Sequence, residues 1–221
     1  MQHQALVELT NVYLKSDRGD QVFRDLSLRL EAGRSALITG PAGSGKTSLV
    51  ELLVGLRRPD SGSVEVMGEV VRPGRQSTLK RVRQSIGGVG GIFGLIPSLT
   101  VAENITFPLV LAGERKKVRR ERLLKALGEF SLLKLAGIYP PMLTRVENML
   151  VQLARASIAH QPLLLIDEPL AGLDRQTLQR ILDYLVSASL AGRSMVILSS
   201  EDLDVVPPAT DRFRISNGTL T

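Results

Sequence analysis

Residues 40–50, GPAGSGKTSLV, have the spacing of a loop that holds a phosphate chain. The pattern G-x-x-x-x-G-K-[ST] is met by Gly40, Gly45, Lys46 and Thr47. Glycines permit a turn whose successive backbone N–H groups point inward, and the helix that follows adds its positive end. The lysine would reach the outer phosphates, and the threonine hydroxyl would bind Mg²⁺. The predicted nucleotide-binding residues of the loop are Gly40, Pro41, Ala42, Gly43, Ser44, Gly45, Lys46, Thr47 and Ser48.

Such a site needs a carboxylate at the end of a neighbouring strand, and residues 163–169, LLLIDEP, supply one. Four apolar residues precede Asp167 and predict a buried strand that ends at this acid. Asp167 and Thr47 would hold the Mg²⁺ ion of the nucleotide, so Asp167 is predicted to bind the nucleotide through the metal. Glu168 would orient or deprotonate the attacking water. A helix-capping turn before Pro169 is the alternative interpretation, and the phosphate loop favours the catalytic one.

Periodicity in the remaining sequence predicts the elements that position these residues. Alternating apolar residues indicate strands near both ends of the chain, whereas the middle has helical spacing. The expected strands span 5–14, 22–30, 35–40, 162–169, 194–200 and 211–221, with a strand pair at 61–71. The expected helices span 100–113, 116–130, 144–160 and 175–192. We therefore expect an α/β core, residues 1–94 and 161–221, that carries a helical subdomain at 95–160.

Length and composition limit the organisation and the chemistry. The 221 residues, 43% of them hydrophobic, suffice for one well-cored domain spanning 1–221. The chain has no cysteine, which excludes disulfides and thiolate metal sites, and its two histidines, His3 and His160, are far apart in sequence. The chemistry is therefore expected to rest on oxygen and nitrogen groups.

The net charge of +6 is concentrated in two basic segments, residues 72–83 and 113–122. These segments are interpreted as solvated helix faces or as a contact with an anionic membrane surface. Nucleic acid is disfavoured as a partner because aromatic residues make up only 4% of the chain. The first ten residues lack a secretory pattern, and no apolar run reaches the roughly 18 residues needed to cross a bilayer. We therefore expect a cytoplasmic location.

Taken together, GPAGSGKTS, LLLIDEP and LAGLD at 170–174 resemble the nucleotide-binding subunit of an ABC transporter. The resemblance covers essentially the whole chain. It implies a P-loop NTPase core of ABC type with an inserted helical subdomain and an antiparallel β subdomain. It also implies ATP and Mg²⁺ as cofactors and a place on the inner face of the membrane. The implied partners are membrane-spanning transporter subunits and a second ATPase subunit, which is either a different chain or another copy of this one. Residues 95–113 are similar to the subgroup that serves lipoprotein release, macrolide export and cell division.

The signature segment departs from this family. In the family two subunits sandwich two ATP molecules, and each site borrows a Ser-Gly-Gly-Gln signature from the opposite subunit. Here the corresponding segment is LTRVE at 143–147, in which Thr144 could replace the serine hydroxyl as a helix N-cap. Arg145 and Val146 stand where glycines would admit the facing phosphate, although Arg145 could itself contact a phosphate. Helical spacing continues through Val146, Met149, Leu150, Leu153, Ala154 and Ile158.

Three further family positions are altered. The glutamine that contacts the metal aligns with Gly91, in a glycine-rich segment expected to be flexible or to need close backbone contact with a partner. The switch histidine aligns with Ser200 or Glu201. The aromatic residue that stacks on adenine aligns with Ser16, and nearby Tyr13 is expected to be a strand residue. The phosphate loop and the two acids that would bind and hydrolyse the nucleotide are thus retained. The signature, the glutamine, the switch histidine and the stacking aromatic of the family are changed.

This uneven pattern supports three hypotheses. The first is a degenerate ABC ATPase subunit that binds Mg-ATP and hydrolyses it weakly or only with a partner. The second is a fully active transporter ATPase whose substitutions are tolerated. The third is a non-catalytic structural subunit that nucleotide stabilises. Measured turnover, with and without a partner, distinguishes the first two.

Overall fold

The computed structural model describes residues 5–168 and 173–221. Its strands are β1 (Ala5–Lys15), β2 (Gln21–Glu31), β3 (Ser35–Thr39), β4 (Ser61–Val66), β5 (Glu69–Val70), β6 (Ile86–Gly90), β7 (Leu163–Asp167), β8 (Ser194–Ser199), β9 (Thr210–Ser216) and β10 (Thr219–Leu220). Its α-helices are α1 (Lys46–Leu53), α2 (Gln76–Gln84), α3 (Val101–Leu111), α4 (Lys116–Glu129), α5 (Arg145–Ser157) and α6 (Arg175–Leu190). Short 3₁₀ turns at Leu133–Leu135 and Pro140–Met142 join α4 to α5.

The strands form two sheets. One is antiparallel, in the order β2-β1-β4-β5. The other has the order β10-β9-β3-β8-β7-β6, and its β9, β3, β8, β7 and β6 run parallel. Because the parallel strands all end at the same edge, β3 and β7 bring the phosphate loop and the acids at 167–168 to one place.

The central strands are buried on both faces, as their near-continuous apolar sequences require. In β7 every residue is buried. Alternate residues enter different cores: Leu163 and Leu165 pack toward the antiparallel sheet and α1, whereas Leu164 and Ile166 pack toward the helices α3, α5 and α6. The central sheet is therefore the common wall of two hydrophobic cores.

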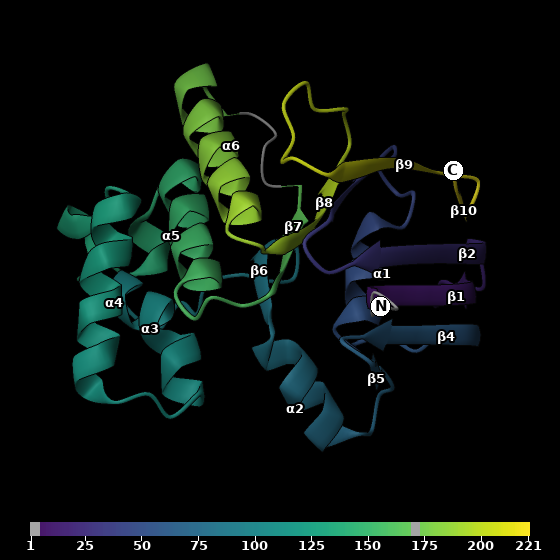
Figure 1. The fold of residues 1–221 in the computed structure, drawn as a ribbon, viewed down its shortest axis with the longest axis horizontal. Helices are drawn as coiled ribbons and strands as arrows, with labels where there is room; N and C mark the ends of the chain where they lie inside the picture. Colours follow the sequence, from purple (N-terminus) through teal and green to yellow (C-terminus); the bar gives the residue numbers. More distant parts are fainter. Residues whose placement is uncertain (1–4, 169–172) are drawn as a thin grey trace.

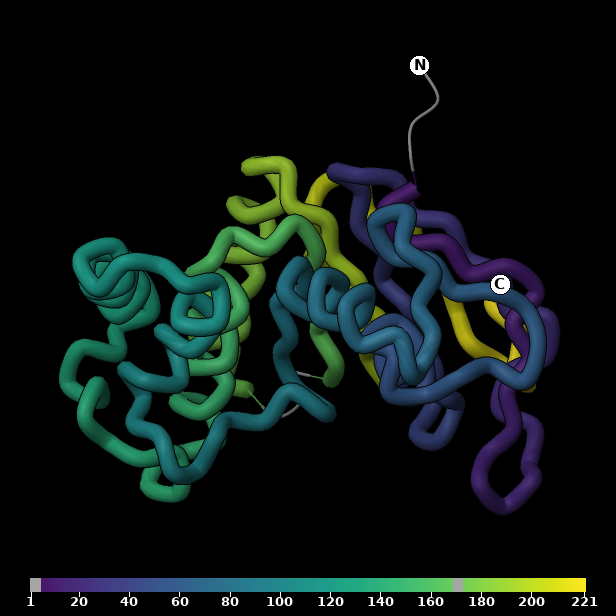
Figure 2. The backbone as a smooth tube through the Cα atoms, turned by 90° about the horizontal axis from the view of Figure 1, so that it is seen from below, coloured from purple at the N-terminus to yellow at the C-terminus, as the bar shows by residue number. Residues whose placement is uncertain are grey.

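Helices α3, α4, α5 and α6 lie on one side of the central sheet, and the antiparallel strands lie on the other side with α1 and α2. Figure 1 shows α3, α4 and α5 together at one end of the molecule, and β1, β2 and β4 at the other. The view from below separates the same two parts (Figure 2). Capping boxes begin α3 at Thr100 and α5 at Thr144, and the Asp174 side chain accepts hydrogen bonds from the first amides of α6.

The observed fold confirms the α/β fold class with its antiparallel sheet and its helices between 95 and 160. One strand, β6, was not expected from the sequence, since IGGVG contains three glycines and glycine weakens strands. The expected turn at Pro169 and the LAGLD residues 170–172 lie outside the described residues, as does His3. No helix in 5–168 and 173–221 has the length and apolar character needed to span a membrane.

Candidate nucleotide site

The phosphate loop joins β3 to α1, and two of its glycines, Gly40 and Gly45, are closely packed. Gly45, the N-cap of α1, has φ +103°, and a Cβ there would come within 2.7 Å of the Phe23 ring. A Cβ on Gly40 would come within 2.6 Å of Ser44 Oγ. The sequence therefore folds into a tight loop, in which the Ser44 N–H donates to the Pro41 backbone oxygen at 3.1 Å.

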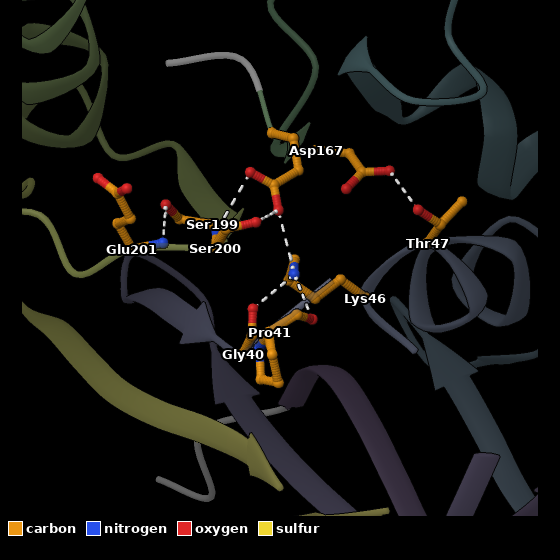
Figure 3. Close-up of polar contacts among 9 residues, drawn as sticks. Gly40, Pro41, Lys46, Thr47, Asp167, Ser199, Ser200 and Glu201 are labelled. Carbon is orange, nitrogen blue, oxygen red and sulfur yellow. Dashed lines mark hydrogen bonds and ion pairs between the residues drawn. The ribbon is translucent and has the colours of Figure 1, made fainter. Parts of the chain in front are cut away.

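Lys46 is the buried cation of this loop, with 6% of its surface exposed. Its Nζ donates hydrogen bonds to the backbone oxygens of Gly40 at 2.6 Å and Pro41 at 3.1 Å. The ammonium group is thus held at the mouth of the loop, as Figure 3 shows. A charge placed there faces the region that loop amides would offer to phosphate oxygens.

Thr47 and Asp167 meet across the site (Figure 3). The Thr47 hydroxyl on α1 donates a 3.1 Å hydrogen bond to Asp167 Oδ2 at the end of β7. Asp167 is only 2% exposed. Burial raises the pKa of this carboxyl, and the hydrogen bond from Thr47 opposes the increase. The structure thus brings together the two side chains predicted to hold Mg²⁺.

Glu168 is held by donors from two elements. Its carboxylate forms an ion pair with Lys46, with 3.1 Å between Oε1 and Nζ. The Ser200 backbone N–H donates to Oε2 at 3.1 Å, and the Ser200 hydroxyl donates to Oε1. Burial alone would raise the pKa of Glu168, but the hydrogen bonds from Ser200 and Lys46 outweigh it and lower the pKa. Glu168 is therefore ionised at neutral pH.

Two buried oxygen atoms of the site, Ser44 Oγ and Asp167 Oδ1, have no hydrogen-bond partner among the described residues. Buried polar atoms are normally satisfied, so these two mark positions where a bound group would complete the site. A hydroxyl inside the phosphate loop suits a phosphate oxygen, and a carboxylate oxygen beside Thr47 suits a hard cation such as Mg²⁺. The residues present therefore fit a magnesium nucleotide.

Gly91 follows β6 and lies directly against Asp167. Its φ is +46°, and a Cβ there would overlap Asp167 Oδ2. Neighbouring glycines are packed as tightly, since a Cβ on Gly87 would overlap the Ala156 backbone oxygen and one on Gly88 would overlap the Phe93 ring. The close contacts of this segment are thus made within the chain, whereas the sequence predicted flexibility or close backbone contact with a partner.

Two side chains of α5 that the sequence did not single out also hold this glycine-rich segment. The Gly90 N–H donates to Gln152 Oε1 at 2.8 Å, and the Arg155 guanidinium donates to the backbone oxygens of Phe93 and Gly94. Burial lowers the pKa of Arg155 to about 10. Nothing in the local sequence signals these contacts, because they join residues about 60 positions apart.

The tip of α5, where the signature would lie, is closed by its own side chains. The Thr144 N–H and hydroxyl each donate to Glu147 Oε2 at 2.8 Å, and the Glu147 N–H donates back to Thr144 Oγ1 at 3.2 Å. The Glu147 carboxylate therefore lies at the tip. A negative charge at a helix N-terminus offsets the positive end of the helix dipole, which would otherwise attract a phosphate.

At the adenine-stacking position, the Ser16 hydroxyl accepts hydrogen bonds from the backbone N–H groups of Arg18 and Asp20. Tyr13 is a β1 residue paired with Ser61 of β4, as expected from the sequence. At the switch position, Ser200 reaches Glu168, whereas the Glu201 N–H donates to Ser199 Oγ at 3.2 Å.

The model of the ABC transporter family matches residues 23–171, which include the phosphate loop and both acids. The chain belongs to the ABC transporter family. The ATP-binding domains of this family bind ATP with Mg²⁺, so the fit of the site to a magnesium nucleotide agrees with the family. As an ABC transporter domain, the chain carries the ATP-binding part of such a transporter.

Named relatives agree with this assignment. The ABC transporter domain is 33% identical over 95% of its length to the methionine import ATP-binding protein MetN of Latilactobacillus sakei, and 32% identical over 95% to that of Geobacillus kaustophilus. It spans 61% of the length of each of these relatives.

Solved structures share the fold. The ATP-binding cassette MJ0796, in a dimeric post-hydrolysis state bound to ADP and Pi, matches with a TM-score of 0.87 at 27% identity, over 97% of this chain and 96% of that one. CbiO1 of Clostridium perfringens, part of the cbiONQ transporter complex, matches with a TM-score of 0.82 at 23% identity, over 98% and 87% of the two chains. This second likeness shows the fold alone.

Proposed function

We propose that this domain binds Mg-ATP in its own phosphate loop and hydrolyses it weakly, or only with a partner that supplies an intact signature. The convergence of Lys46, Thr47, Asp167 and Glu168 around two unpartnered oxygens supports the binding half of the proposal. The Glu147 carboxylate at the tip of α5 supports the impaired half. A γ-phosphate that faced this tip would meet a negative charge.

Each site residue has a role in this proposal. The amides of residues 40–48 and the Lys46 ammonium bind the phosphate chain, and Thr47 with Asp167 holds Mg²⁺. Bound Mg²⁺ supplies charge compensation for the phosphates. Glu168, ionised and directed by Ser200, accepts a proton from the attacking water. The phosphates must first draw Lys46 away from Glu168, because the ion pair occupies both side chains.

The assembly proposal follows from the altered signature. A homodimer would place two altered tips over two complete phosphate loops. A second, different ATPase chain with an intact signature would cover the ATP held by residues 40–47 and leave the opposite site weak. We therefore place the domain in a heterodimer beneath membrane-spanning subunits, on the cytoplasmic face, with no nucleic-acid partner.

Residues 95–113 support a place near the lipoprotein-release, macrolide-export and cell-division subgroup, although the relatives named above are methionine import proteins. The altered elements favour the degenerate ATPase over the fully active ATPase and over the structural subunit. The domain organisation proposed is a core of 1–94 and 161–221 with a helical subdomain at 95–160.

Titration calorimetry with Mg-ATP tests the binding half. Lys46→Ala should weaken ATP binding by about 10- to 150-fold, because a hydrogen bond to a charged group contributes roughly 1.5–3 kcal/mol. Lys80→Ala, which removes an exposed lysine of α2, is the matched control and should bind as wild type does. Equal ATP affinity of the wild type and Lys46→Ala would contradict the assignment of the phosphate loop.

A further inference from the structure

A large cavity lies beside the phosphate loop, on the side of the antiparallel sheet. Its volume is about 810 Å³, and residues 41–44 of the loop form one wall. The opposite wall consists of Ser16 and Asp20 from the turn between β1 and β2, Arg24 of β2, and Asn217 of the β9–β10 turn. A cavity that continues from a phosphate loop is where the base and sugar of a bound nucleotide would lie.

Within residues 5–168 and 173–221, no aromatic side chain lines this cavity. Ser16 is occupied within its own turn, and Tyr13, which is 41% exposed, does not line the cavity. A base therefore has no aromatic ring to stack on here, and its recognition falls to polar groups.

Arg24 and Asp20 are unpaired polar groups at this wall. The Arg24 backbone N–H donates to the Gly218 oxygen at 2.7 Å, which anchors the residue beside the cavity. Within the described part of the chain, neither the Arg24 guanidinium nor the Asp20 carboxylate has a hydrogen-bond or ion-pair partner. A planar cation and an anion are thus both available to a ligand in the cavity.

The chemistry of these two groups does not select adenine. A guanidinium stacks on the face of any base, because every base offers a π-face. A carboxylate accepts hydrogen bonds from adjacent N–H donors, as a bidentate acceptor. The Watson–Crick edge of guanine presents two adjacent donors, N1–H and N2–H, whereas that of adenine pairs one amino donor with an acceptor nitrogen that a carboxylate repels.

We propose that the cavity is a purine site in which Arg24 stacks on the base and Asp20 reads its edge, so that GTP binds at least as tightly as ATP. The inference rests on the proposed function, since it assumes that the phosphate loop binds a nucleoside triphosphate. It assigns the base specificity of the site to two residues outside the phosphate loop.

Titration calorimetry of the 221-residue chain with Mg-ATP, Mg-GTP and Mg-tripolyphosphate tests the proposal. Tripolyphosphate reports on the phosphate loop alone, because it has no base. Arg24→Ala should weaken both nucleotides by about 5- to 150-fold, the range measured for bases on stacking platforms, and should leave tripolyphosphate unchanged. Asp20→Asn should weaken GTP about tenfold relative to ATP.

Arg18→Ala is the matched control, since Arg18 is exposed on the same turn and does not line the cavity. Wild-type ATP affinity more than tenfold above that for GTP, with no effect of Arg24→Ala, would overturn the inference and leave the proposed function intact. A GTP preference that survives Asp20→Asn would overturn the role of Asp20. If wild type binds none of the three probes, the proposed function itself fails.

Discussion

The contact between Gly91 and Asp167 leads to a prediction that runs against the family pattern. The family has a glutamine at this position, so a side chain would be expected to restore function. In this chain Gly91 has φ +46°, and any Cβ would overlap the Asp167 carboxylate. We expect Gly91→Ala, and equally Gly91→Gln, to destabilise the protein.

The size of the effect follows from two costs. A residue with a Cβ in the left-handed region costs roughly 1–2 kcal/mol. Displacing the buried Asp167 carboxylate weakens its bond to Thr47, and a lost buried hydrogen bond costs about 1–3 kcal/mol. The sum is about 2–5 kcal/mol, which lowers Tm by roughly 4–20 °C in a domain of this size.

Thermal unfolding followed by circular dichroism measures this difference. Gly94→Ala is the control, because Gly94 lies three residues further along the same segment and a Cβ there would meet nothing within 4 Å. Both substitutions reduce the entropy of the unfolded chain equally, so that effect cancels between them. If Gly91→Ala unfolds at the same temperature as Gly94→Ala, the argument that Gly91 is required by close contact is wrong.

Three other predictions concern the signature, the metal acid and the assembly. In a Glu168→Gln background, changing residues 144–147 to Ser-Gly-Gly-Gln should produce an ATP-dependent dimer in light scattering, because the change removes the Glu147 charge. A persistent monomer would show that the N-terminal tip of α5 is not what prevents pairing. Asp167→Asn should raise Tm relative to wild type, and the difference should grow as pH rises. Burial raises the pKa of Asp167 above its unfolded value, so the cost of burying the ionised carboxylate reaches its full size only above the folded pKa. A pH-independent difference in Tm counts against this, and Mg-ATP should reduce the difference. Native mass spectrometry of the complex purified from membranes should find one copy of this chain with a different ATPase, and two copies with no other ATPase would exclude the heterodimer.

The sequence by itself determined the elements and residues that depend on local order. The phosphate loop is recognisable because its glycines, lysine and threonine are contiguous, and β7 because an apolar run ends in an acid. The Asn217–Gly218 turn between β9 and β10, with φ values of +50° and +81°, was not separated from the strand expected at 211–221, although an Asn-Gly pair is a local turn signal. These features need no knowledge of distant residues.

Tertiary structure alone decided how the altered positions are used. The sequence marks Gly91 as a missing glutamine, but only the pairing of β6 with β7 shows that Asp167 occupies the space of a side chain there. Ser200 likewise reaches Glu168 because β8 lies beside β7, 32 positions away in sequence. Sequence patterns report neighbours along the chain, whereas these contacts depend on which strands pair and in what register.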